Sequence, residues 1–135
     1  MNSIKVRNSA SFRIRPDTNE FQNDFLMKTG LKPSKIGIKG EPVYEGLSRT
    51  WENNYLSIKA PLGNDVDLEK HLLWLWNLLK DHKSYIRELN KREDIDIDIF
   101  GTFTSDANCP SVFIKPEAFM IFTELNISFE YSILA

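Results

Sequence analysis

Three aspartates separated by single residues form the group best suited to chemistry in this 135-residue sequence. Asp94, Asp96 and Asp98 alternate with isoleucines, so in an extended strand their carboxylates lie on one side, about 7 Å apart. Such a row could hold Mg²⁺ or Ca²⁺, or it could form an acidic strip that binds a basic partner. It could also be a solvated strand face whose inward isoleucines pack in the core, which the pattern favours, or pair across strands with Arg13 and Arg15. Metal binding is the least favoured of these, because the strand has no glycine-turned loop to wrap ligands around an ion.

Two histidines and one cysteine are the remaining groups with chemical potential. His71 and His82 are eleven residues apart on one predicted helix, about 16 Å along its axis, so they cannot share a metal ion. His82 falls within the apolar stripe of that helix and is predicted to be a packed histidine. Cys109 precedes Pro110 in a predicted turn, away from any helix N-terminus that would stabilise a thiolate. Because glycine-rich phosphate loops, nucleophile elbows and zinc patterns are also missing, we expect no catalytic residue, no metal and no cofactor.

The elements that must position these side chains alternate between short strands and helices. Period-two patterns predict strands at 12–15, 36–40, 55–58, 94–104, 111–114 and 127–133. Capping residues and apolar spacing predict helices at 17–29, 64–90 and 116–125. This mixture predicts one α+β domain over residues 1–135. We expect two layers, with a mixed or antiparallel sheet of about five to six strands and one long and two shorter helices packed on one face.

The ends of the two shorter helices carry local signals. Gly30 is suited to the left-handed position that ends the first helix. Pro116 suits the first position of the last helix, and Asn126 can take a left-handed exit from it. Within that helix, Phe119 and Phe122 are predicted to face the core.

The long helix carries the clearest pattern in the chain. Apolar residues with 4-3 spacing over 68–89 form one stripe about 100° wide, which predicts a helix laid across the sheet. Trp74 and Tyr85 lie outside this stripe, so the helix has more apolar surface than one sheet contact requires. Either the loop 41–54 with Trp51 covers this flank, or Trp51, Trp74 and Tyr85 bind a partner.

Composition indicates an ordinary globular protein, with 41% apolar and 27% charged residues and a net charge of −2. Residues 1–40 carry eight basic and three acidic side chains, so residues 41–135 carry −7. The single cysteine forms no internal disulfide, no apolar leader opens the chain, and no apolar run reaches the roughly 18 residues of a membrane span. We therefore expect a cytoplasmic protein without membrane contact. Aromatic and basic residues are not interleaved, which argues against binding nucleic acid.

Several segments resemble the uncharacterised bacterial family known as domain of unknown function 4279. The most specific are Thr-Gly-Leu-Lys-Pro-Ser at 29–34, Lys-Gly-Glu at 39–41, and Trp51. The resemblance covers nearly the whole chain, and it implies no catalytic residues because the family has no established activity. Small acidic proteins of this kind are often immunity partners of bacterial toxins, which suggests one function.

These observations favour a non-enzymatic binding protein. The first hypothesis is an immunity protein that neutralises a cognate toxin by direct protein–protein contact, with Asp94, Asp96 and Asp98 facing a basic toxin domain. Two alternatives stay open. One is a small-molecule-binding or enzymatic domain in which Trp51 and residues 39–41 line a pocket, and the other is a homo-oligomeric scaffold. The sequence determines neither the partner nor the oligomeric state.

Overall fold

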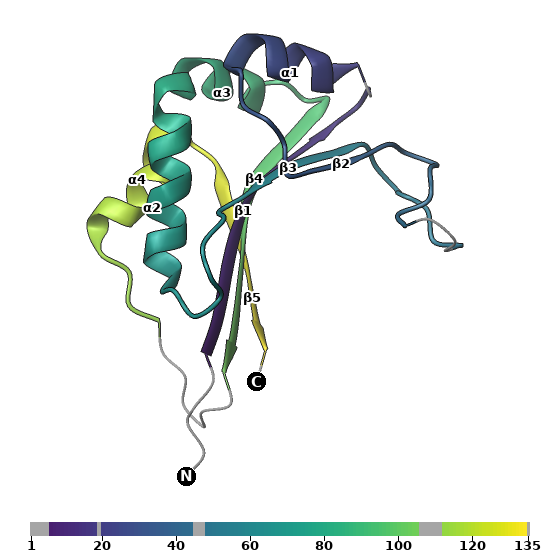
Figure 1. Cartoon of the computed structure of the whole chain (residues 1–135). Coiled ribbons are helices and arrows are strands. Elements are labelled where there is room, and N and C mark those ends of the chain that lie inside the picture. Colours follow the sequence, from purple (N-terminus) through teal and green to yellow (C-terminus); the bar gives the residue numbers. More distant parts are fainter. Residues whose placement is uncertain (1–5, 19, 45–47, 106–111, 135) are drawn as a thin grey trace.

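The computed structural model describes residues 6–18, 20–44, 48–105 and 112–134, and it is built around a mixed β-sheet (Figure 1). The strands are β1 (Val6–Pro16), β2 (Lys35–Gly37), β3 (Tyr55–Lys59), β4 (Ile95–Ser105) and β5 (Ser128–Leu134). The helices are α1 (Phe21–Thr29), α2 (Leu68–Leu79), α3 (Lys83–Asn90) and α4 (Pro116–Leu125). The strand order is β2-β3-β1-β4-β5, and neighbours are antiparallel except for the parallel pair β4 and β5. The predicted α+β class with a mixed sheet is confirmed.

The centre of the sheet is the pair β1 and β4, each eleven residues long. They pair along their whole length, with Phe12 opposite Ile99 and Ile14 opposite Ile97. Because successive side chains point to opposite faces, these four side chains lie together on one face, where they are buried. Helices α2, α3 and α4 pack on that face, whereas no described helix covers the other face (Figure 1). The second face is termed the open face.

The predicted end signals of the short helices are confirmed. Gly30 adopts a left-handed conformation with φ of 68° at the end of α1. Pro116 is the first residue of α4, and Asn126 follows it with a left-handed φ of 56°. The inward position predicted for Phe119 is wrong, since its side chain is 44% exposed. The buried stripe of α4 runs instead through Ala118 and the positions three and seven residues after it.

The predicted long helix is interrupted by a 3-10 turn at Lys80–His82, labelled η1. The predicted apolar stripe is nevertheless buried at Leu68, Leu72, Leu75, Leu79, Ile86 and Leu89. His82 is only half-buried, and its backbone leaves the helical region with φ of −113° and ψ of 17°, so the prediction of a packed His82 is wrong. Because α2 packs on β1 whereas α3 packs on β4, the two segments follow different strands of a twisted sheet.

Most predicted strands are present, with shifted ends. The strand predicted at 12–15 is the C-terminal part of the longer β1, and the one predicted at 36–40 shortens to β2. A strand at 112–114 is wrong, because these residues form no strand pairing, and residue 111 lies outside the described residues.

Candidate functional site

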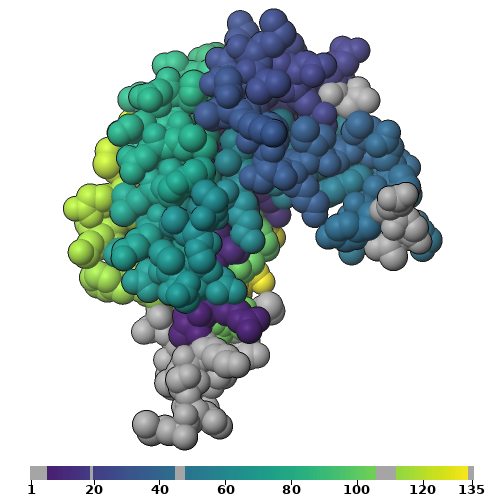
Figure 2. Space-filling view, viewed as in Figure 1, coloured from purple at the N-terminus to yellow at the C-terminus, as the bar shows by residue number. Residues whose placement is uncertain are grey.

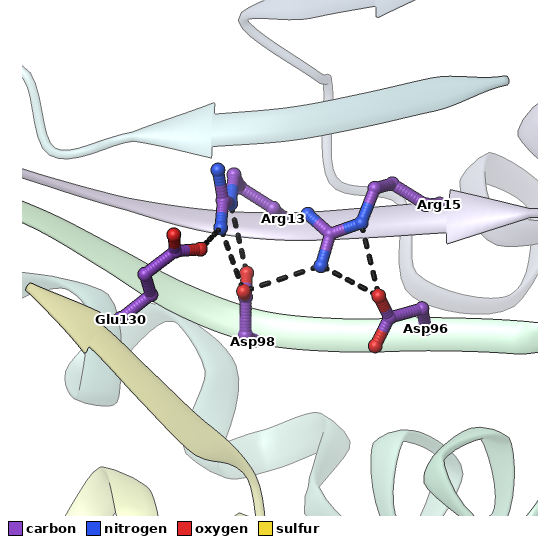
Figure 3. Close-up of polar contacts among 5 residues, drawn as sticks. All are labelled: Arg13, Arg15, Asp96, Asp98 and Glu130. Atoms are coloured by element: carbon purple, nitrogen blue, oxygen red, sulfur yellow. Dashed lines mark hydrogen bonds and ion pairs between the residues drawn. The ribbon is translucent and has the colours of Figure 1, made fainter. Parts of the chain in front are cut away.

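The aspartates of β4 meet arginines of β1 on the open face (Figure 3). The strand register sets Arg13 opposite Asp98, and Arg15 and Asp96 form the next pair. Arg13 donates to both carboxylate oxygens of Asp98, at 2.8 and 2.7 Å, and its Nη2 also donates to Glu130 at 2.6 Å. Arg15 donates to Asp96 at 2.8 Å and to Asp98 at 3.2 Å. These five side chains form the β1–β4 ion-pair network, and the cross-strand pairing considered from the sequence is confirmed.

Asp98 stays charged inside this network. Its side chain is 9% exposed, and burial alone would raise its pKa. Hydrogen bonds from Arg13 and Arg15 outweigh that effect and hold the pKa of Asp98 below its ordinary value. The hydrogen bond to Asp98 in turn raises the pKa of Arg13. The Arg13 guanidinium also lies 4.4 Å above the ring of Phe100, so Arg13 is positioned by a carboxylate and by an aromatic ring.

Asp94 stands apart from this network. It precedes β4 and accepts hydrogen bonds from Arg92 at 2.6 and 3.0 Å, which lower the pKa of Asp94. The three aspartates therefore do not form a row of accessible carboxylates, since Asp98 is buried and Asp96 shares Arg15 with it. Among the described residues, no group of three or more His, Cys, Asp or Glu side chains is placed to hold a metal ion.

A second feature is the arm, defined as residues 38–54 between β2 and β3, of which 45–47 lie outside the described residues. It projects away from the helices and the body of the protein, and open space lies beneath it (Figure 2). Backbone hydrogen bonds join its two halves, including one from the Trp51 N–H to the carbonyl of Glu41 at 2.9 Å. The arm is therefore a hairpin-like extension of the sheet and not a cover for the helices.

Two side chains hold the arm to the sheet. Asn54 is buried, and its Nδ2 donates a hydrogen bond at 3.1 Å to the carbonyl of Asp17, the residue that follows β1. The Trp51 ring stacks on Tyr55 with centroids 5.1 Å apart. It also lies directly against Gly37, where an added Cβ would be 2.4 Å from the ring. Gly37 is thus required for this close approach, as glycine within a strand often is.

Where the arm meets the sheet there is a hollow of about 350 Å³, termed the arm hollow. Three cations and three aromatic rings dominate its lining: Arg15, Lys35, Arg49, Tyr44, Trp51 and Tyr55. Glu52 is the one carboxylate among the described lining residues, so three positive charges less one give a formal charge of +2.

The cations of the arm hollow differ in how they are paired. Arg15 is engaged by the β1–β4 network. The Lys35 ammonium lies 5.4 Å from the ring centre of Tyr44 and 5.3 Å from that of Trp51. Neither Lys35 nor Arg49 forms an ion pair with any carboxylate in the part of the chain that the structure describes. Two cations are therefore available beside aromatic surface.

On the aromatic flank of the helices, Tyr85 packs against α1 and not against the arm. Tyr85 lies against Phe25 of α1, with ring centres 6.3 Å apart, and burial raises the pKa of Tyr85. Trp74 is half-buried and packs against the core. The predicted cover by the loop 41–54 is wrong, because Trp51 stacks on the open face of the sheet, opposite the helices. The structure therefore does not bring Trp51 together with Trp74 and Tyr85.

The fully buried histidine is His71, whereas His82 is half-buried. His71 Nε2 lies 3.2 Å from the carbonyl oxygens of both Gly63 and Val66, so Nε2 carries the proton and donates. Nδ1 has no hydrogen-bond partner among the described residues, and burial lowers the pKa of His71. The neutral ring fastens the loop before α2, a structural role. Cys109 lies outside the described residues.

Sequence reasoning identified Trp51 but missed Lys35, Tyr44 and Arg49, which surround the same hollow. A glycine within a predicted strand, Gly37, was the one signal of a close approach. The segment 29–34, which carries much of the family resemblance, connects α1 to β2 and lies outside the hollow's lining.

Comparison with known proteins adds a family but no activity. A family model described as Domain of unknown function (DUF4279) matches residues 4–135. No curated protein and no solved structure matches the chain. Within the described residues, no helix has the length and apolar character needed to cross a membrane. The arm hollow and the β1–β4 ion-pair network are therefore the basis on which a function can be assigned.

Proposed function

Since this chain belongs to the family of domain of unknown function 4279, we propose that it is a non-enzymatic binding protein acting by direct contact with another protein. The observation that carries the proposal is the arm hollow, whose lining combines aromatic rings with Lys35 and Arg49, two cations that form no ion pair with the described carboxylates. The proposed contact surface is this hollow together with the adjoining open face of the sheet.

The composition of this surface suits protein recognition. Tryptophan, tyrosine and arginine are the residues most enriched at the energetic centres of protein interfaces, and all three line the hollow. Tyr44 is 59% exposed, so its ring is accessible to a partner. The β1–β4 network supports the same role. Because Asp98 and Arg13 already neutralise each other, a partner can cover both without leaving either charge unpaired.

In its specific form, the proposal is that the partner is a bacterial toxin and that binding blocks the active face of the toxin. The small size of the chain supports this immunity role, which requires affinity but no catalytic group. The contact differs from the acidic strip expected from the sequence. Asp96 and Asp98 are engaged by arginines, so the arm hollow takes their place as the centre of the proposed interface.

The experiment is a capture and protection assay with the toxin encoded beside the gene for this chain. We expect the wild-type chain to bind the toxin and to protect cells that express it. Lys35→Glu combined with Arg49→Glu should abolish both, whereas Lys70→Glu, on the exposed side of α2, should retain both. If the wild-type chain neither binds nor protects, the immunity role is refuted. If the double variant protects fully, the arm hollow is not the contact.

Small-molecule binding is a second candidate, favoured by the volume of the arm hollow. About 350 Å³ lies within the range of ligand sites, roughly 300–1,000 Å³. Trp51 lines the hollow as expected for this alternative, but residues 39–41 do not. A panel of aromatic carboxylic acids in a thermal-shift assay tests it. This function requires a stabilisation that disappears in Trp51→Ala and persists in Trp74→Ala.

A further inference from the structure

We propose that the arm hollow takes an acidic peptide segment, with a carboxylate side chain held between Lys35 and Arg49. The proposal rests on the protein-binding function given above and names the chemistry that the partner must present. It follows from three features of the hollow: which cations form no ion pair with a described carboxylate, how the rings hold Lys35, and which carboxylates lie nearby.

The free cations set the charge of the ligand. Arg15 already donates to Asp96 and Asp98, so it lines the hollow without offering a full charge. Lys35 and Arg49 have no such partner among the described carboxylates. An ammonium and a guanidinium in one hollow suit a carboxylate, because charge-assisted hydrogen bonds of this kind are about twice as strong as neutral ones.

The rings position Lys35 without consuming its donors. Its ammonium lies over both Tyr44 and Trp51, at 5.4 and 5.3 Å from the ring centres. Aromatic faces attract a cation but accept no strong hydrogen bond, so the three N–H groups of Lys35 remain for an incoming acceptor. The Trp51 ring stacks on Tyr55 and lies directly against Gly37. It therefore offers an aromatic surface on which a neighbouring apolar side chain of the ligand can pack.

The surroundings distinguish an acidic peptide from a nucleic acid. The whole chain carries a net charge of −2, and carboxylates of Glu52, Asp96 and Glu130 lie on the arm or on the open face. A nucleic-acid strand carries a phosphate on every nucleotide and needs cations along its length. Two cations without ion pairs among the described residues can satisfy one or two carboxylates, and the nearby carboxylates of Glu52, Asp96 and Glu130 would repel a longer row of negative charges. A peptide with isolated acidic side chains therefore fits the hollow, and a phosphate chain does not.

The test is fluorescence anisotropy of the full chain with two labelled octapeptide pools. One pool has glutamate at two central positions, and the other has glutamine there. We expect the glutamate pool to bind at least tenfold more tightly at low salt and to weaken as salt rises. Lys35→Glu combined with Arg49→Glu should lower that affinity at least tenfold, while the matched charge reversal Lys70→Glu on α2 leaves it unchanged. Circular dichroism shows whether each variant is folded.

Two results would overturn this assignment. One is that the glutamate and glutamine pools bind equally, or that neither binds, or that the double variant keeps the wild-type affinity for the glutamate pool. The other is tighter binding of an eight-nucleotide oligothymidylate than of the glutamate pool. The immunity role fails separately. If the chain binds the glutamate pool but does not capture the toxin, the peptide site stands and the immunity role is refuted. If the variant with Lys35→Glu and Arg49→Glu still captures the toxin, the immunity role stands and the peptide site is refuted.

Discussion

Replacing Asp98 by asparagine measures how strongly the β1–β4 ion-pair network holds the sheet together. The substitution keeps the side-chain size but removes the negative charge that faces Arg13 and Arg15. The side chains of Arg13 and Arg15 are only 15% and 22% exposed, so water solvates their positive charges incompletely once the carboxylate is gone. Breaking a fully buried pair costs about 3–5 kcal/mol, and the partial exposure of the arginines reduces our expectation to about 2–3 kcal/mol of unfolding free energy.

Urea unfolding followed by circular dichroism measures this loss, which corresponds to a fall in Tm of roughly 10 °C. Asp96→Asn is the matched control on the same strand and face. Its side chain is 73% exposed and shares one arginine, so we expect a loss of at most about 1 kcal/mol. Asp94→Asn, outside the network, should leave the unfolding midpoint unchanged. The three aspartates of one sequence pattern thus separate into three different outcomes.

Equal losses for Asp98→Asn and Asp96→Asn would refute this reasoning, because burial would then not decide the strength of the pairs. Acid titration provides an independent check. The folded pKa of Asp98 lies below its ordinary value of 3.8, so its contribution is complete above pH 3.8 and is lost as the pH falls through the folded pKa. Wild-type protein should therefore lose more stability than Asp98→Asn over that acidic range.

Three further predictions concern the arm, the buried histidine and the helix ends. Gly37→Ala places a Cβ 2.4 Å from the Trp51 ring, so it should displace the ring, change near-ultraviolet circular dichroism and cost about 1–3 kcal/mol in urea unfolding. The folded pKa of His71 is lowered, so the unfolding free energy should fall below pH 6.5 by up to about 1.4 kcal/mol per pH unit, a slope that His71→Gln removes. Gly30→Ala and Asn126→Ala, at left-handed positions, should each lose about 1 kcal/mol in urea unfolding, whereas Asn126→Gly should not.

Each of these predictions has its own contradicting result. Ile36→Ala, at an exposed residue beside Gly37, should preserve the aromatic circular dichroism, and an identical change in both variants would show that Trp51 is not the cause. A pH slope that persists in His71→Gln would assign the titration to another group. A loss in Asn126→Gly as large as in Asn126→Ala would contradict the role of left-handed strain.

Local signals predicted most of the elements, because they act over a few residues of chain. Gly30, Pro116 and Asn126 mark helix ends through their own backbone preferences, and the structure confirms all three. Strict alternation over 94–104 predicted β4 and the burial of its isoleucines. The 4-3 spacing over 68–89 predicted the apolar residues that α2 and α3 bury.

Packing decided where these elements bend. The turn at Lys80–His82 lies between α2, which packs on β1, and α3, which packs on β4. The change of strand between the two helices depends on the twist of the sheet. Apolar spacing continues through the turn, so it could not locate the break. For the same reason it assigned His82 to the core, while the loop before α2 buries His71 instead.

The sequence by itself determined which side chains face the same way along each strand, and it therefore placed Asp96, Asp98, Arg13 and Arg15 on outward faces. Only the tertiary structure decided that these charges meet, since Arg13 and Asp98 are 85 residues apart. The arm hollow likewise depends on the pairing of β2 with β3, which brings Lys35 to Trp51. Alternation is a property of one strand, whereas contact between strands depends on their order and register, which no local pattern encodes.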